Sequence, residues 1–138
     1  QVYAHSGPEL GFGAVRITDK AASDPLLKHL ARELCFMQWH FDTFDLPAQA
    51  TLLMTNDICK HQAYRIGDMT YAFQFHFEVT PEIVLSWLSE KNDWIEKTYP
   101  YLTSQIKAQL QTHMKGSAEF AQLVATRWLA LFPSKISV

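Results

Sequence analysis

The sequence has 138 residues, of which 48% are hydrophobic and 19% are charged, a balance typical of one ordinary globular domain. Its formal net charge of -2 gives no electrostatic reason to expect nucleic acid or an anionic membrane as a partner. No apolar run approaches the ~20 residues of a membrane span. The two cysteines are too few for a disulfide framework, which favours the reducing environment of the cytoplasm.

The first eighty residues have the patterns of β-strands and tight turns. Apolar or alternating segments predict strands at residues 2–4, 10–18, 35–40, 51–55, 62–66 and 69–75. Gly67-Asp68, between the last two of these strands, is typical of a two-residue hairpin turn. A Ser-Asp-Pro sequence at Ser23 predicts a short helix that runs through Ala31.

After residue 80 the pattern changes to that of helices. A Thr-Pro-Glu sequence at Thr80 combines an N-cap, a proline of the first turn and an acidic residue. A second helix is expected from Pro100 to Gly116, and a third from Ser117 to Pro133. Strands followed by three covering helices indicate an α+β domain, or equally the later part of an α/β domain whose first βα units lie elsewhere.

One cluster of residues with catalytic chemistry follows the predicted strand 69–75. The strand is followed by His76, at the kind of strand end where open α/β sheets place their sites. In an extended chain, residues two apart face the same side, so the carboxylate of Glu78 can reach the His76 ring. A carboxylate bonded to one ring nitrogen raises the basicity of the other, which a general base requires. The alternative is a strand-end histidine in a purely structural polar contact.

A second cluster follows the predicted strand 35–40, where His40 and Asp42 are again two residues apart. Together with His76 and Glu78 they allow another interpretation, a metal-dependent hydrolase. However, their spacing matches no tight ligand motif, and we assign no metal site.

Four segments of the sequence resemble the class I glutamine amidotransferases. Phe73–Glu82 resembles the signature F-Q-F-H-P-E-V-T-P-E of that family. Trp39–Pro47 is similar to the W-H-G-D-T-F-D-L-P segment of small stand-alone members, which are themselves similar to the amidotransferase domain of GMP synthase. Cys59–Gly67 resembles C-P-x-Q-A-F-R-I-G, and Glu9–Phe12 resembles E-[IL]-G-W. The match covers most of residues 1–90 in the right order.

The resemblance implies the later part of a flavodoxin-like, three-layer α/β fold. It also implies a Cys-His-Glu triad that hydrolyses glutamine to glutamate and ammonia, without a cofactor or metal. His76 and Glu78 occupy the positions of the triad histidine and glutamate, and His40 and Asp42 match the motif that supports the substrate pocket. The ammonia of such enzymes usually passes to a synthase domain or subunit, which makes such a synthase an expected partner.

The triad cysteine of the family lies in a G-x-C-x-G elbow, and neither Cys35 nor Cys59 has the flanking glycines. Cys35 is interpreted as a core thiol, and Cys59 matches a non-catalytic position of the family. The resemblance places the elbow ahead of Gln1. We therefore expect residues 1–138 to be a single, partial domain that lacks the opening βα units and does not hydrolyse glutamine alone.

Two substitutions favour an alternative, a non-catalytic binding or regulatory module with the same fold. Phe41 replaces the glycine of the family motif and Phe77 replaces its proline, which we expect to place bulk beside the site. If the opening βα units are missing, strand edges become exposed, and we expect a homo-oligomer or strand-swapped dimer.

Overall fold

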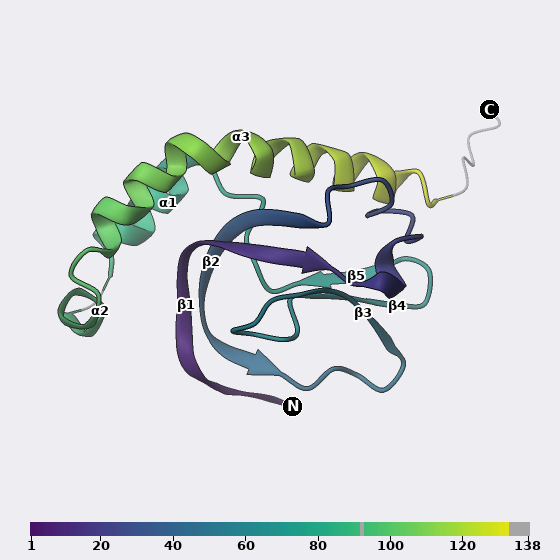
Figure 1. The fold of residues 1–138 in the computed structure, drawn as a ribbon, viewed down its shortest axis with the longest axis horizontal. Helices are drawn as coiled ribbons and strands as arrows, with labels where there is room; N and C mark the ends of the chain where they lie inside the picture. Colours follow the sequence, from purple (N-terminus) through teal and green to yellow (C-terminus); the bar gives the residue numbers. More distant parts are fainter. Residues whose placement is uncertain (92, 133–138) are drawn as a thin grey trace.

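The computed structural model describes residues 1–91 and 93–132, which form one sheet followed by helices (Figure 1). The elements are, in chain order, β1 (Val2–Ile17), the 3-10 turn η1 (Asp19–Ala21), β2 (Glu33–Phe44), β3 (Ala50–Thr55), β4 (Ala63–Ile66), β5 (Thr70–Phe73), α1 (Pro81–Ser89), α2 (Asp93–Thr98) and α3 (Leu102–Leu129). The strands lie in the order β2-β1-β3-β4-β5, and every neighbouring pair is antiparallel.

The long strands β1 and β2 form a curled ribbon that supports the rest of the sheet (Figure 1). The two segments predicted at 2–4 and 10–18 belong to one strand, because β2 pairs with β1 on both sides of an irregularity between Ala4 and Glu9. At its far end β1 changes partner, and Arg16 and Ile17 pair with β3. Pairing with β2 therefore makes one continuous strand of two segments that the sequence pattern predicts as separate strands.

The predicted hairpin between β4 and β5 is present, but its turn is one residue longer than expected. Ile66 pairs with Thr70, which leaves residues 67–69 in the turn. Gly67 has a φ of 59°, a left-handed conformation that glycine adopts without steric cost.

The prediction of a short helix from Ser23 to Ala31 is wrong. The segment forms a series of turns, and the only helical residues nearby are those of η1. The backbone carbonyls of Leu26 and Lys28 accept hydrogen bonds from the Arg127 guanidinium, at 2.6 and 3.0 Å, so α3 holds this segment. His29 then has a φ of 66°, which a continuing helix does not allow.

The predicted boundary between two helices at Gly116 and Ser117 is also wrong, because α3 is continuous from Leu102 to Leu129. Ser117 is fully buried inside the helix and does not cap it. Glycine in a helix interior costs about 1 kcal/mol relative to alanine, and the packing of α3 on both sides of Gly116 offsets this cost. The predicted stop at Pro133 lies outside the described residues.

The start of α1 follows the prediction. The Thr80 hydroxyl accepts a hydrogen bond from the backbone N–H of Ile83 at 3.4 Å, and Pro81 occupies the first turn. A hydrogen bond from Thr80 also lowers the pKa of the Glu82 carboxyl below its usual value, and a backbone hydrogen bond adds to this effect.

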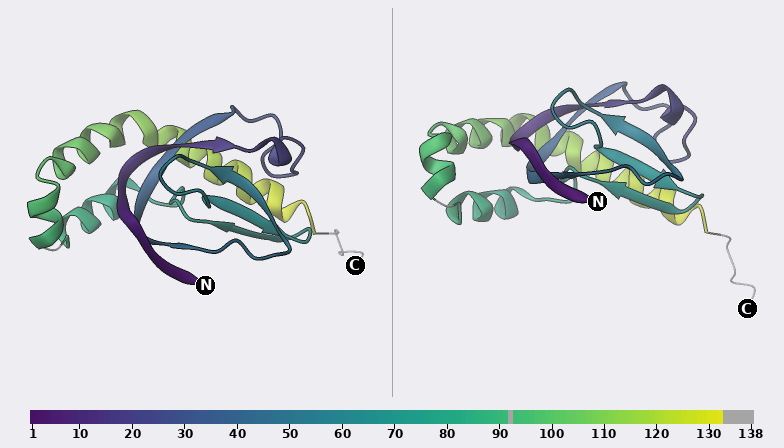
Figure 2. Two further views of the ribbon diagram at one scale, coloured as in Figure 1. Left: turned by 60° about the horizontal axis from the view of Figure 1, so that its bottom comes forward. Right: turned by 90° about the horizontal axis from the view of Figure 1, so that it is seen from below.

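Two apolar clusters join the helices to the sheet, and α3 contributes to both. Figure 2 shows the course of α3 along the domain. Adjacent residues of β2 face opposite sides of the strand, so Phe36 belongs to one cluster and Met37 to the other. Phe120 and Val124 of α3 pack in the cluster of Phe36, whereas Ile106 packs with Met37, α1 and α2. The helix thereby ties the two ends of the domain together.

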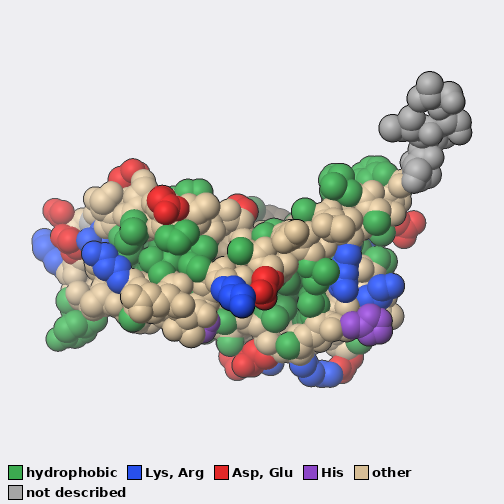
Figure 3. All heavy atoms as spheres, turned by 90° about the horizontal axis from the view of Figure 1, so that it is seen from above, with side chains coloured by type: hydrophobic (Ala, Val, Ile, Leu, Met, Phe, Trp, Pro, Cys, Tyr) green, Lys and Arg blue, Asp and Glu red, His purple; other side chains and the backbone are tan. Residues whose placement is uncertain are grey.

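Figure 3 looks onto α3, where charged and hydrophobic side chains are interspersed. Hydrophobic groups gather near its C-terminal end, where Trp128, Leu129 and Phe132 are 38%, 64% and 43% exposed. Within the described residues, none of the helices has the length and hydropathy to span a membrane.

Candidate functional site

The His76 ring and the Glu78 carboxylate, which the sequence pairs, are in direct contact. Nδ1 of His76 lies 2.8 Å from Oε1 of Glu78. The two side chains are 31% and 59% exposed, so the pair is open to a molecule from solvent. Because a carboxylate only accepts hydrogen bonds, Nδ1 carries the proton in this contact. In the neutral ring, Nε2 then has a free lone pair.

Two further contacts fix His76 beside β2. Its backbone N–H donates to the carbonyl of Met37 at 2.8 Å, in an isolated antiparallel bridge on the side of β2 opposite β1. The ring of Trp87, on α1, lies edge-on to the imidazole with 5.0 Å between ring centroids. His76 therefore follows β5 by three residues and sits at a sheet edge, rather than at the carboxyl end of a parallel strand.

Within the part of the chain that the structure describes, Nε2 of His76 makes no hydrogen bond. A histidine with one nitrogen held by a carboxylate and the other unoccupied can accept a proton from a nucleophile and return it to a leaving group. This is the chemistry expected for this pair from the sequence.

The other predicted histidine, His40, occupies a different environment, a buried network of polar side chains. Its Nε2 lies 3.2 Å from Oε2 of Glu9 and 3.1 Å from Oε1 of Gln38. Its Nδ1 lies 3.2 Å from the backbone carbonyl of Asp42, and the Asp42 carboxylate itself is exposed. Both ring nitrogens of His40 thus face acceptors of the protein, which fits a supporting role and leaves neither free for a substrate.

Glu9 is the centre of this network, and its side chain is only 4% exposed. Its Oε1 accepts a hydrogen bond from Asn56 Nδ2 at 2.6 Å, and its Oε2 accepts one from Gln62 Nε2 at 2.8 Å. Gln62 accepts in turn from Gln38 at 3.3 Å. The sequence pattern did not reveal these partners, although Glu9 and Gln62 both lie in segments that carry the family resemblance.

The structure does not bring the two predicted clusters together as a metal site. Within residues 1–91 and 93–132, no group of three or more histidine, cysteine, aspartate or glutamate side chains has a geometry suited to a metal ion. His40 is used in the buried network, and the His76 ring contacts Glu78 and Trp87.

Neither cysteine has the environment of an activated nucleophile. Cys59 is fully buried, and its Sγ lies 3.3 Å from the Thr43 hydroxyl. Cys35 is partly buried, and burial raises the pKa of its thiol above the usual value, with a smaller contribution from the Glu33 carboxylate. A raised pKa lowers the fraction of thiolate, which is the reactive form.

The two phenylalanines that replace small residues of the motif have different surroundings. Phe77 packs into the core, with ring centroids 4.9 Å from Phe73 and 5.3 Å from Phe120, so it adds apolar packing under α3. Phe41 is 40% exposed and lies 6.1 Å from the ring of Trp94. Phe41 therefore changes the exposed surface beside Trp94, whereas the half-buried Phe77 changes an apolar hollow under α3 that it helps to line.

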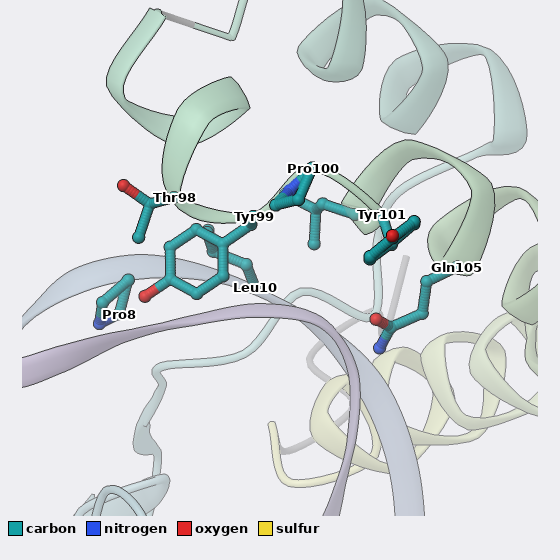
Figure 4. A pocket seen from close by; sticks show the side chains of 8 residues that line it. Pro8, Leu10, Thr98, Tyr99, Pro100, Tyr101 and Gln105 are labelled. Carbon is teal, nitrogen blue, oxygen red and sulfur yellow. The ribbon is translucent and has the colours of Figure 1, made fainter.

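Figure 4 shows a cavity of about 390 Å³ between β1 and the junction of α2 and α3. The Tyr99 ring lies beside Leu10 in this view, with its hydroxyl directed toward Pro8. No charged side chain lines the cavity, so it contains no acid–base pair. The lining residues are Pro8, Leu10, Thr98, Tyr99, Pro100, Tyr101, Leu102 and Gln105.

No family model matches the sequence, and no curated protein matches it. The fold is similar to that of a glutamine amidotransferase from Thermotoga maritima, with a TM-score of 0.80 and 25% identity over 94% of this chain and 54% of that one. A glutamine amidotransferase from Methylobacillus flagellatus gives a TM-score of 0.80 and 23% identity over 96% of this chain and 56% of that one. A structure described as a GMP synthase component from Thermoplasma acidophilum gives a TM-score of 0.51 and 23% identity over 64% of this chain and 50% of that one.

The chain therefore has a class I glutamine amidotransferase-like fold, and the fold implied by the resemblance is confirmed. It spans about half the length of the solved structures that it matches.

Proposed function

We propose that this chain contributes the histidine and the glutamate of a Cys-His-Glu triad in the hydrolysis of glutamine to glutamate and ammonia. The observation that carries the proposal is the 2.8 Å contact between His76 Nδ1 and Glu78 Oε1, which leaves Nε2 unoccupied. The similarity to amidotransferase structures supports the same general function.

In this reaction Nε2 of His76 accepts the proton of a cysteine thiol as the sulfur attacks the side-chain amide of glutamine. His76 then donates that proton to the departing nitrogen, which leaves as ammonia. The acyl group remains on the sulfur as a thioester, and water hydrolyses the thioester to glutamate and the free thiol. Glu78 holds the ring in the tautomer that presents Nε2. We propose that neither Cys35, which is partly buried and has a raised pKa, nor the fully buried Cys59 supplies the thiol, which then comes from another polypeptide segment.

The proposal is tested by measuring glutamate and ammonia release in the natural protein that carries this sequence. His76→Ala is expected to lower kcat by about 10²–10⁴-fold, since it removes the general base. His29→Asn is the matched control, because His29 is exposed, remote in sequence from the pair, and in a left-handed conformation that asparagine tolerates. Full turnover by the His76→Ala protein would overturn the assignment.

A second measurement tests which polypeptide segment supplies the thiol, independently of the role of His76. The isolated chain is expected to give no turnover. If it hydrolyses glutamine and His76→Ala abolishes that activity, the role of His76 holds but one of the two cysteines here is the nucleophile.

One observation favours the second candidate, a non-catalytic binding or regulatory module. Phe41 places an accessible ring where the family motif has glycine. In that case the natural protein binds glutamine, as calorimetry would detect, without releasing ammonia.

The remaining partner expectations belong to the same proposal. An ammonia-accepting synthase fits the likeness to the structure described as a GMP synthase component. A cytoplasmic location fits two cysteines that are both free.

Self-association through an edge strand such as β5 is tested by sedimentation velocity, and a monomer at all concentrations would contradict it.

A further inference from the structure

A second cavity, of about 300 Å³, lies beside the candidate site, between β2 and the helices α1 and α2. This volume is at the lower end of the range for small-molecule sites. The lining residues are Trp39, Phe41, Trp87, Glu90, Lys91 and Ile95. The cavity adjoins the His76–Glu78 pair, because Trp87 lines the cavity and its ring also contacts the His76 ring.

Aromatic rings from separate elements gather at this cavity. The rings of Trp39 and Trp87 have centroids 6.0 Å apart, and Phe41 lies 6.1 Å from Trp94. Of the lining rings, Phe41 is 40% exposed, whereas Trp39 and Trp87 are half-buried and also pack against the core cluster of Met37. Trp94, which lies beside Phe41 outside the lining, is 51% exposed. Accessible aromatic faces concentrated at one small hollow are typical of binding sites rather than of a folding core.

The charges around the cavity favour a cation. The ammonium of Lys91 is already engaged, 2.9 Å from Glu96 and 3.2 Å from the carbonyl of Leu88, and its side chain is 15% exposed. Glu90, in contrast, is exposed and forms no ion pair with any described residue; its Oε1 only accepts a hydrogen bond from Ser86, at 3.1 Å.

One flanking residue, Asp93, adds negative charge, because it precedes Trp94 and is exposed. Asp42 follows Phe41 in β2 and therefore faces the opposite side of the strand, away from the cavity. Lys97, in the last turn of α2, is the only lysine or arginine of this helix. Carboxylates thus outnumber free ammonium groups around the aromatic lining.

We propose that this aromatic cavity binds a small organic cation, of the tetraalkylammonium or protonated-amine class. The ring faces attract a cation through their quadrupole, and Glu90 supplies a carboxylate at the rim. The same surroundings repel an anion, and a neutral molecule of equal size gains only the burial of its apolar surface. The inference does not depend on glutamine hydrolysis, because it rests on residues outside the His76–Glu78 pair.

The test compares three ligands of similar shape: tetramethylammonium, neutral tert-butyl alcohol and anionic pivalate. Tryptophan fluorescence reports binding in a Trp128→Phe background, because Trp128 lies in a different hollow under α3, whereas Trp39 and Trp87 line this cavity. Sodium chloride matches the ionic strength. The cation is expected to bind roughly 2- to 30-fold more tightly than the alcohol, the range that a cation–π contribution supports, and pivalate more weakly than either.

Two variants locate the site. Phe41→Leu keeps an apolar side chain without the ring, and Glu90→Gln removes the charge. Each substitution is expected to weaken the binding of tetramethylammonium several-fold and to leave the binding of the alcohol unchanged. Glu119→Gln, an exposed carboxylate on α3, is the matched control and is expected to change nothing. Equal binding of cation and alcohol, or no binding up to high millimolar concentration, would overturn the proposal. A loss of hydrolysis with intact cation binding would concern the proposed function alone.

Discussion

The side-chain amide of Gln109 pairs with both backbone groups of Phe12. It donates to the Phe12 carbonyl at 3.0 Å and accepts from the Phe12 N–H at 3.1 Å, so α3 completes the hydrogen bonding of β1 where β3 does not reach. The approach depends on Gly11, which has a φ of 95°. A Cβ at Gly11 would lie 3.1 Å from Gln109 Oε1 and 3.3 Å from a side-chain carbon of Ile106.

Gly11→Ala is therefore expected to lower the free energy of unfolding by about 1–3 kcal/mol, because it combines a strained backbone with a close contact. Urea titration measures the change. Gly116→Ala is the matched control in α3, where a Cβ meets nothing within 4 Å. That substitution is expected to stabilise the chain by about 0.5–1 kcal/mol, since alanine is the better helix former. A Gly11→Ala protein as stable as the parent would contradict the close packing of β1 on α3.

The buried carboxylate of Glu9 leads to a second prediction. Glu9→Ala leaves Asn56 and Gln62 without their acceptor, and we expect a loss of about 2–5 kcal/mol in the free energy of unfolding. Glu9→Gln keeps the volume but sets an amide N–H₂ against these donors, so we expect a smaller loss.

Asp42→Asn is the control, because the Asp42 carboxylate is exposed, and we expect it to stay within about 0.5 kcal/mol. If Glu9→Ala unfolds at the same urea concentration as the control, the network does not contribute to stability.

Much of the fold follows from local sequence. The Thr80 cap, the strands β3 to β5 and the pairing of His76 with Glu78 depend on residues a few positions apart, where periodicity and side-chain chemistry decide the outcome. The missed features depend on contacts between distant segments. The Arg127 guanidinium donates hydrogen bonds to the carbonyls of Leu26 and Lys28, and this segment forms turns where the sequence predicts a helix.

The candidate site divides in the same way. The contact of His76 with Glu78 was predictable from a spacing of two residues, whereas the partner of His40 was not. Glu9 is 31 positions away from His40 in the sequence, and the two meet because the irregularity in β1 sets the register that pairs them. No local pattern encodes that register, which is why the sequence analysis grouped His40 with Asp42 and not with Glu9.

Thiol labelling provides a third prediction. Because burial raises the pKa of Cys35, the folded chain at pH 7 holds less thiolate there than a free cysteine does, and its reaction with iodoacetamide is expected to be slower. The rate should increase as the pH rises toward and past the raised pKa. Cys59, which is fully buried, is expected to react only after unfolding. Mass spectrometry of peptides distinguishes the two sites, and rapid labelling of Cys35 at pH 7 would make it a candidate nucleophile again.

The fourth prediction concerns the tautomer of His76. In the parent chain the neutral ring is expected to carry its proton on Nδ1, because Glu78 accepts there, and ¹⁵N NMR of the imidazole nitrogens distinguishes the two forms. In Glu78→Gln the amide can donate as well as accept, so the preference for the Nδ1–H form should weaken. The free energy of unfolding should change by no more than about 1 kcal/mol, because the pair is largely exposed.

Glu90→Gln, a carboxylate beyond Trp87, is the control and should leave the tautomer as in the parent. An unchanged tautomer in Glu78→Gln would mean that the contact with Glu78 does not set the orientation of the ring, and that Trp87 and the backbone bond to Met37 hold it alone.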